Sequence, residues 1–300
     1  VYIRREHDCL CLDLDTGALR RTISAPAHSP DGKPGTWGYL ACVDGTLFGT
    51  LADRTHLVEF RYIRGDMSTQ FTESTVLFAM DAQTGEEKWR YVPKHSIRHN
   101  ALAIGDGRVH LIDRAQAAFD RLDPAYKGRS GRRDVKPFPH GTLVALNAKT
   151  GRELGRNAES IWGTTLALST EHKVLVMAYQ NASFQLRSEL GGRLAAFGAA
   201  DGKRIWDVEA RYRSRLALSG RTIYAQPGDW DLLTGKRGTF TFSRAYGCGT
   251  VAASRTMLLF RSGTIGFVDL TSNYGTENYG GARPGCWINA IPAGGLALVP

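Results

Sequence analysis

An eleven-residue pattern recurs six times along this chain and narrows the possible architectures sharply. Its clearest copy, residues 79–89, reads AMDAQTGEEKW, with aspartate at the third position, Thr-Gly at the sixth and seventh, and tryptophan at the end. The other copies begin at Cys11, Ala145, Ala196, Asp229 and Phe267. Successive copies start 33 to 68 residues apart. Self-similarity at such intervals indicates a propeller or a solenoid built from repeated units.

The residues of this motif predict a β-hairpin. Asp81 can accept hydrogen bonds from the backbone amides of a turn at Thr84, and Gly85 can supply the positive φ that the turn needs. A strand follows the turn, and we expect the closing Trp89 to pack across to the neighbouring unit. Trp206 closes a second copy in the same way. The remaining copies end in Arg21, Gly155, Thr239 and Glu277, which weakens the expected docking there.

A second periodic element precedes several of the hairpins. It consists of a short apolar strand, a turn and another apolar strand, as in residues 40–48, 102–109, 216–224 and 251–259. Together with the hairpin this gives four antiparallel strands, which is the make-up of one propeller blade. No stretch has a convincing helical period, so we expect helix to be nearly absent.

These repeats resemble the PQQ-like, or quinoprotein-like, β-propeller family with its tryptophan-docking motifs. That family extends from quinoprotein alcohol dehydrogenases to the propeller lipoprotein of outer-membrane assembly. The resemblance covers essentially all 300 residues. It implies an all-β propeller of about six to eight four-stranded antiparallel blades. The last sixty residues are similar to the C-terminal blades of large bacterial PQQ-like repeat proteins.

The two ends of the chain bear on its organisation. Residues 1–3 have the character of the middle of a strand, and residues 294–300 that of a turn followed by the start of a strand. We therefore expect residues 1–300 to form one propeller domain that is part of a longer chain, such as a truncated eight-bladed ring. In the alternative, residues 288–300 and 1–21 complete one shared blade and close the ring.

The net charge of +9 lies partly in a basic loop insertion, residues 113–141. Such a loop could attract an anionic sugar, a phospholipid surface or nucleic acid. A solvated insertion is favoured, because no nucleic-acid motif and no interleaved aromatic residues are present, and nucleic acid is not an expected partner. The longest apolar runs are too short for a transmembrane segment.

Five cysteines are present, and none forms a C-x-x-C pair, which argues against a zinc knuckle or an attached haem. Cys248 and Cys286 each stand just before an expected inner strand. A disulfide between them, or to a cysteine outside this sequence, would fit an oxidising compartment. Cys9 and Cys11 face the same side of an extended strand, a strained geometry for a direct bond, and buried free thiols are the alternative for them. The adjacent Cys-Cys pair of the quinoprotein alcohol dehydrogenases is absent, which places cofactor-dependent activity in doubt.

Chemistry in a propeller is expected where loops enter the innermost strands and form a funnel. Aromatic rings beside guanidinium groups there would suit a flat anionic ligand, and PQQ is a planar tricarboxylate. Alternatively, Trp-Gly at an inner strand is a packing device. The funnel candidates for ligand binding are Trp37, His99, Trp162, Arg213, Arg244, Tyr246, Arg261, Arg283, Trp287 and Asn289.

The resemblance also implies Ca²⁺ held by oxygen ligands and an aspartate acting as general base. However, Asp81, Asp231 and Asp269 belong to docking hairpins, where the turns use their carboxylates. The spacing of acidic residues and histidines predicts no metal site, and no catalytic residue can be assigned.

Two functions follow from these features. The first is an exported binding or scaffolding propeller, periplasmic or attached to the cell envelope, that presents its funnel or a blade edge. Its partner would be another protein or a fused domain, with a small anionic ligand as a further option. The alternative is a PQQ- and calcium-dependent quinoprotein oxidoreductase that acts on alcohols or sugars.

Overall fold

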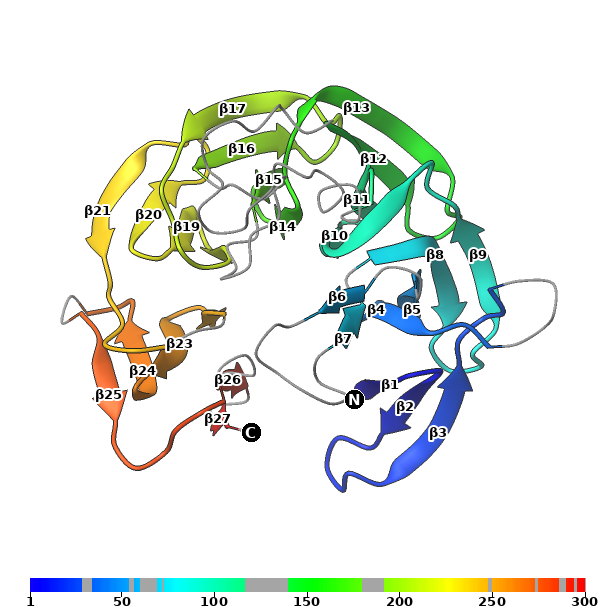
Figure 1. Ribbon diagram of the computed structural model, residues 1–300, viewed down its shortest axis with the longest axis horizontal. Coiled ribbons are helices and arrows are strands. Elements are labelled where there is room, and N and C mark those ends of the chain that lie inside the picture. Colours follow the sequence, from blue (N-terminus) through cyan, green and yellow to red (C-terminus); the bar gives the residue numbers. More distant parts are fainter. Residues whose placement is uncertain are drawn as a thin grey trace. The chain divides into compact units, whose positions relative to one another are not determined.

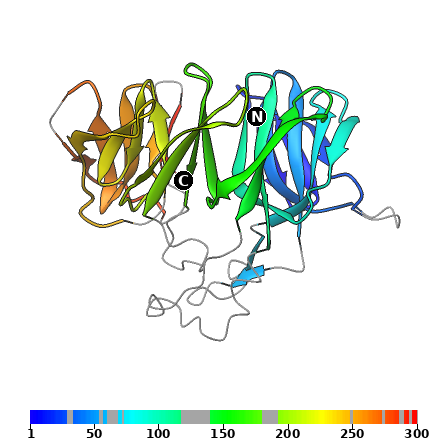
Figure 2. The ribbon, with the colours of Figure 1, turned by 90° about the horizontal axis from the view of Figure 1, so that it is seen from above.

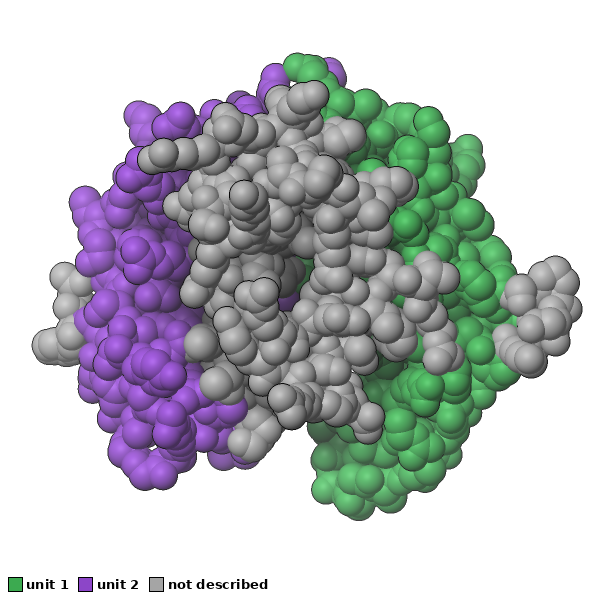
Figure 3. Space-filling model, viewed as in Figure 1, with its two compact units in different colours: residues 1–163, 186–188 green, residues 164–185, 189–300 purple. Residues whose placement is uncertain are grey.

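The computed structural model describes residues 1–28, 34–53, 57–59, 69–71, 73–116, 140–179, 192–247, 250–272, 275–285, 290–293 and 296–299. Over these residues the regular structure is entirely β-strand. No helix in them is long and apolar enough to cross a bilayer. The chain divides into two compact units, one with the described residues up to Gly163 and one with those from Thr164 onward (Figure 3).

The first unit contains three neighbouring antiparallel sheets (Figure 1). Strands β1, β2 and β3 form the first sheet, β4, β5, β8 and β9 the second, and β10 to β13 the third, with a small separate β6–β7 pair. The bounds are β1 (Tyr2–Arg5), β2 (Asp8–Leu12), β3 (Leu19–Ser24), β4 (Trp37–Val43), β5 (Thr46–Ala52), β6 (Leu57–Glu59), β7 (Thr69–Phe71), β8 (Glu73–Asp81), β9 (Glu87–Tyr91), β10 (Ser96–Gly105), β11 (Arg108–Arg114), β12 (Gly141–Asn147) and β13 (Glu153–Ile161).

A short pairing of β8 with β10 joins the second and third sheets. Ser74 lies opposite Ile97 and Glu73 opposite Arg98, and a bulge in β10 follows. Figure 2 shows the strands of these two sheets standing side by side when the molecule is turned. The pairing brings the beginnings of the inner strands β4 and β10 into one neighbourhood, which matters for the site below.

The second unit repeats the same pattern. Its sheets are β14 to β17, β18 to β21 and β22 to β25, followed by a β26–β27 pair. The bounds are β14 (Thr165–Ser169), β15 (Val174–Ala178), β16 (Arg193–Gly198), β17 (Arg204–Glu209), β18 (Ala217–Ser219), β19 (Thr222–Ala225), β20 (Gly228–Asp231), β21 (Arg237–Thr241), β22 (Ala252–Ala253), β23 (Met257–Ser262), β24 (Thr264–Asp269), β25 (Glu277–Tyr279), β26 (Ile291–Ala293) and β27 (Leu296–Leu298).

Apolar layers between successive sheets form the core. The first seam, between β1–β3 and the second sheet, buries Ile23, Trp37 and Phe78. The second seam, between the second sheet and β10–β13, buries Trp89 and Leu111. In the second unit, the third seam lies between β14–β17 and β18–β21 and is built around Trp230 and its neighbours. Burial of each large apolar side chain stabilises the fold by about 1.5–3 kcal/mol.

Four-stranded antiparallel sheets packed face to face in sequence order are propeller blades. The predicted fold class, an all-β propeller with four-stranded blades, is therefore confirmed.

Candidate functional site

Most docking turns are built around one acidic or amide side chain at the third position of the motif, although the copy that begins at Ala196 has a glycine there. Asp81 Oδ1 accepts hydrogen bonds from the amides of Gln83 (2.8 Å) and Thr84 (3.0 Å), and Gly85 closes the turn at a φ of 77°. The bond from the Thr84 backbone is the largest influence that lowers the pKa of Asp81 to about 2, followed by those from Gln83 and Lys88. The same amide contacts occur at Asp13, Asn147 and Asp231. These side-chain oxygens are therefore engaged in turns.

Trp89 joins the second sheet to the third at the second seam. Its indole N–H donates to the carbonyl oxygen of Ala148 at 3.0 Å. A Cβ placed on Gly151 would lie 2.6 Å from Cδ2 of the ring, so the ring rests directly against this glycine. Phe48 packs against the indole with the ring centroids 6.1 Å apart.

Trp206 makes the same arrangement at the third seam. Its indole N–H donates to the carbonyl oxygen of Leu232 at 3.0 Å, and a Cβ on Gly235 would lie 2.7 Å from its Cε3. The indole thus makes one hydrogen bond to the residue after the turn aspartate and one close contact with the turn glycine. This geometry repeats in both units.

Trp37, the first residue of β4, lies inside the first seam. It is fully buried, and its ring meets Phe78 edge-on with the centroids 5.0 Å apart. Trp162, which follows β13, is only 4% exposed. Neither ring has a free face on which a planar ligand could stack.

Two arginines, the buried Arg114 and the exposed Arg4, hold the backbone at these tryptophans. Nη1 of Arg114, at the end of β11, donates to the carbonyl oxygens of Trp162 and Gly163, both at 3.0 Å. Nη1 of Arg4, on β1, donates to Trp37 (3.0 Å) and to the carbonyl of residue 38 (2.9 Å). In both cases an arginine near the end of a strand clasps the Trp-Gly dipeptide that follows its sheet in the sequence. We call this arrangement the arginine clasp, and it favours the packing interpretation of Trp-Gly.

His99 lies in β10 within a buried polar cluster. Its Nε2 is 2.8 Å from Ser74 Oγ, which in turn is 2.7 Å from Thr50 Oγ1. Gly38 faces all three side chains, and a Cβ there would come within 2.6 Å of each of them. Burial, and secondarily the charge of Arg4, lower the pKa of His99 to about 4. The imidazole is therefore neutral near pH 7, and its contacts are made within the protein.

Glu73 and Arg98 face each other across the β8–β10 pairing. Both side chains are almost completely buried, with Arg98 Nε 3.5 Å from Glu73 Oε1. Such a pair needs both partners, because a single buried charge is strongly unfavourable. Arg98 is therefore committed to Glu73.

In the second unit, Tyr246 is an exposed aromatic residue on a constrained segment. The residue is 63% exposed, and the guanidinium of Arg261 lies 5.5 Å from the centroid of the Tyr246 ring. The Ala245 amide donates to Ser262 Oγ at 2.9 Å, and the Gly263 amide donates to the Tyr246 carbonyl at 2.5 Å. These bonds fix residues 245 and 246 against the end of β23.

The remaining basic candidates differ in exposure. Arg261 is buried, whereas Arg244 is half-buried with its guanidinium 5.2 Å from the Phe260 ring centroid. Arg213 and Arg283 are exposed. Trp287, Asn289, Cys248, Cys286 and residues 117–139 of the basic insertion lie outside the described residues.

The described residues do not fit a PQQ–calcium site. Among them, no three His, Cys, Asp or Glu side chains gather where they could hold a metal ion. The two described funnel tryptophans are enclosed, and the docking aspartates already accept bonds from their own turns. No catalytic step through either group follows from these residues.

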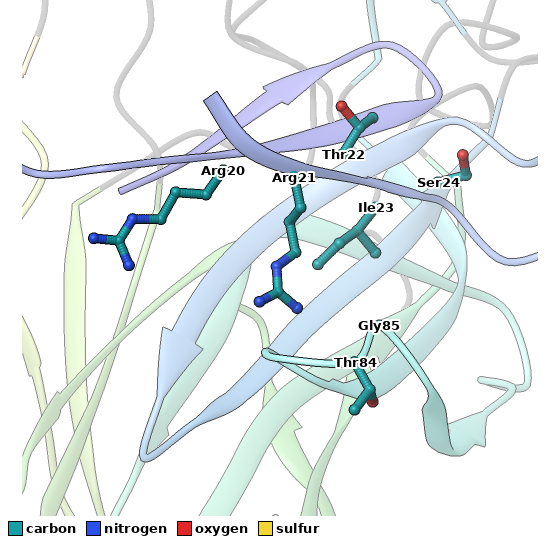
Figure 4. Close-up of a pocket in the computed structure, with 7 residues that line it drawn as sticks. All are labelled: Arg20, Arg21, Thr22, Ile23, Ser24, Thr84 and Gly85. Atoms are coloured by element: carbon teal, nitrogen blue, oxygen red, sulfur yellow. The ribbon is translucent and has the colours of Figure 1, made fainter. Parts of the chain in front are cut away.

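A recess of about 490 Å³ opens at the first seam. Figure 4 shows Arg21 and Ile23 extending from β3 toward the turn that carries Thr84 and Gly85, while Arg20 points away. The recess is lined by Arg20, Arg21, Thr22, Ile23, Ser24, Thr84 and Gly85. Sequence reasoning identified Arg21 only as a missing tryptophan. It also missed Arg4 and Arg114, whose acceptors are distant backbone carbonyls.

Comparisons with known proteins agree with this architecture. No family model matches the chain. BamB from Moraxella catarrhalis superimposes with a TM-score of 0.52 at 11% identity, covering 98% of this chain and 79% of that chain. A chain of a mitotic checkpoint complex gives a TM-score of 0.58 at 8% identity, covering 97% and 76%. At these identities the likeness concerns the fold.

One stretch of sequence is also similar to an enzyme. The quinoprotein glucose dehydrogenase of Escherichia coli (strain K12) is 30% identical over 92 residues, which amounts to 29% of this chain. The predicted resemblance to the PQQ-like propellers is confirmed. The matched stretch spans 11% of that enzyme, so its activity does not extend to this chain by similarity alone.

Proposed function

We propose that this chain is a binding and scaffolding propeller module that presents a basic, aromatic surface of its second unit to an anionic partner. Residues 1–300 would form one propeller domain, exported from the cytoplasm and located in the periplasm or cell envelope. The partner would be an acidic protein surface or a fused domain.

The exposed Tyr246, held over Arg261 at the end of β23, is the observation that carries this proposal. Aromatic residues and arginines are enriched in binding interfaces, and a ring on a constrained backbone loses little conformational freedom on binding. The exposed Arg213 and Arg283 belong to the same unit, and the chain carries a net charge of +9. Long-range attraction would therefore favour acidic partners.

The predicted funnel residues of the first unit also support this proposal, because they are occupied by contacts within the protein. Trp37, His99 and Trp162 make their contacts within the protein, as described above. They therefore support a structural role for the inner strands of this unit.

A PQQ- and calcium-dependent oxidoreductase acting on alcohols or sugars is the second candidate. The 92-residue match to quinoprotein glucose dehydrogenase favours it. The described residues lack a calcium-holding cluster, so this candidate ranks below the binding module.

One titration series separates the two functions. Hexaglutamate and, separately, PQQ with Ca²⁺ are titrated into the protein by calorimetry, and turnover is assayed with an artificial electron acceptor. We expect salt-sensitive hexaglutamate binding that weakens at least about fivefold in Tyr246→Ala and Arg283→Glu. The matched control Arg152→Glu makes the same charge change at an exposed turn of the first unit and should bind as the wild type does.

If hexaglutamate binding weakens equally in Arg152→Glu, the effect is explained by net charge alone, and the proposed surface is wrong. Saturable PQQ binding accompanied by turnover would instead establish the oxidoreductase.

A further inference from the structure

The first seam lacks a tryptophan at a position whose register is fixed. In β9 and β17, Trp89 and Trp206 lie opposite Ala79 and Ala196, the first residues of their motif copies. In β3, Arg21 lies opposite Cys11, which is also a first residue. Arg21 therefore occupies the tryptophan position of this blade.

The residues around Arg21 are placed like those around the docking tryptophans of the second and third seams. A Cβ on Gly235 would lie 3.2 Å from Val208, two residues after Trp206. A Cβ on Gly85 would likewise lie 3.2 Å from Ile23, two residues after Arg21. The platform on which an indole rests in the other seams is thus present, and only the ring is absent.

The carbonyl that would receive the indole N–H is also in place. Ala148 and Leu232, which accept that bond in the other seams, each come directly after the turn Asn or Asp. Ala82 is the equivalent residue of the first seam, and its carbonyl oxygen accepts a bond of 3.3 Å from the Tyr2 hydroxyl. This bond is long, and a carbonyl oxygen has a second lone pair, so the position can still accept a donor.

The charges around the recess complement an acidic ligand. Arg20 is held by the carboxylate of Asp13. Arg21 is exposed and has no carboxylate partner among the described residues. A guanidinium can stack on an aromatic ring and bind a carboxylate in bidentate fashion.

We infer that this recess is a docking site for an aromatic side chain, foremost the indole of a tryptophan, supplied in trans by an acidic segment of a partner protein. The ring would lie between Arg21 and Gly85 over Ile23, and a carboxylate beside it would pair with Arg21. The occupant is set by what fills the same position in the second and third seams. This site is separate from the surface around Tyr246.

The test uses fluorescence anisotropy with a fluorescein-labelled hexapeptide that has one tryptophan between glutamates. Saturable binding to the wild type is expected, weakened at least about tenfold when the peptide tryptophan becomes alanine. The variant Arg21→Trp should weaken binding by at least the same factor, because the protein then fills its own recess. Thr22→Glu, at an exposed lining position, should weaken it by placing a negative charge in the recess.

The matched control Arg255→Trp adds the same side chain at an exposed turn of the second unit and should bind as tightly as the wild type. Undiminished binding to Arg21→Trp, or no saturable binding up to about 1 mM peptide, would overturn the inference. Competition by inorganic phosphate would do the same, because it would identify an anion site rather than an aromatic one. Hexaglutamate binding that persists when this peptide fails would sink the inference and leave the proposed function intact.

Discussion

The first and second seams of the first unit differ in how two adjacent blades are joined. The first seam has an arginine clasp, from Arg4 of the first sheet to the Trp-Gly dipeptide that begins the second sheet. The clasp of Arg114 involves the third sheet and the dipeptide after it, so it is not part of the second seam. At the second seam an indole spans the blades, from Trp89 to Gly151. At the first, a tyrosine hydroxyl makes the equivalent hydrogen bond and a recess takes the place of the ring.

The arginine clasp and the docked indole join blades independently of each other. The Arg4 clasp is made entirely to backbone carbonyls at the start of the second sheet, so it can join the two sheets whatever side chains line the seam. The indole acts at the docking turn, and the first seam forms without it. Removal of the ring should therefore be costly only where the seam is built around it.

The largest effect is expected from Trp89→Ala. The substitution removes a buried ring and its hydrogen bond to Ala148, and large-to-small changes of this kind cost about 3–5 kcal/mol. The matched change Arg21→Ala, at the same position of the first seam, should cost no more than about 0.5 kcal/mol. Urea denaturation of both variants measures the difference. Equal losses would show that the seams do not differ in the way described.

Alanine substitutions at the turn glycines should also be most destabilising where a tryptophan ring lies against the glycine. Gly151, Gly85 and Gly17 all have positive φ, so alanine at each carries a backbone strain of about 1–2 kcal/mol. A Cβ would meet the Trp89 ring at 2.6 Å on Gly151, Ile23 at 3.2 Å on Gly85, and nothing within 4 Å on Gly17. We expect Gly151→Ala to cost about 2–4 kcal/mol in total, with Gly85→Ala between it and Gly17→Ala.

The melting temperatures of the three alanine variants give this ranking. If Gly17→Ala is as destabilising as Gly151→Ala, backbone strain alone accounts for the effect and the contact with the ring adds nothing.

The blades could be predicted from the sequence because the residues that specify each docking hairpin are close together in the chain. Asp81, Thr84, Gly85 and Trp89 lie within one motif copy, and a turn followed by a strand depends on neighbouring residues only. The funnel residues were harder to interpret, because burial decides their role and burial is a property of the assembled sheets. Trp37 and Trp162 have the composition of a ligand platform, yet both are enclosed.

The arginine clasp was not predicted from the sequence, for a different reason. Its acceptors are backbone carbonyls, which every residue carries, and Arg4 reaches a carbonyl 33 residues away. Similarly, Arg21 showed only that a tryptophan was missing. That Tyr2 bonds to Ala82 while the ring position stays open depends on how two blades pack.

Acid should weaken the contact between the second and third sheets through His99, which lies on β10 and contacts Ser74 on β8. Its pKa is lowered to about 4 in the fold, by burial first and by Arg4 second, and it is 6.5 in the unfolded chain. The unfolded state therefore binds more protons between these values, so stability falls as the pH falls from about 6.5 to 4. The loss attributable to this residue is about 2–3 kcal/mol.

Urea denaturation at pH 7 and pH 4.5 measures the loss. His99→Gln, which cannot titrate, should lose less stability over this interval than the wild type. His110, whose pKa is also lowered to about 4 by burial and Arg108, lies in the third sheet and contributes its own part. An identical pH dependence in the wild type and His99→Gln would exclude His99 as a source of acid sensitivity.

The smallest effect, and the one that tests the comparison most directly, is expected from Arg21→Trp. The variant places an indole over Gly85 and Ile23, where the register and the Ala82 carbonyl already match those of the filled seams. The gain is limited because the recess is open to solvent and Tyr2 already bonds to Ala82, so we expect about 1 kcal/mol of added stability. Thermal unfolding beside the Arg255→Trp control measures it. If the variant is destabilised, the recess is not shaped for an indole, and both the proposed docking site and the equivalence of the seams fail together.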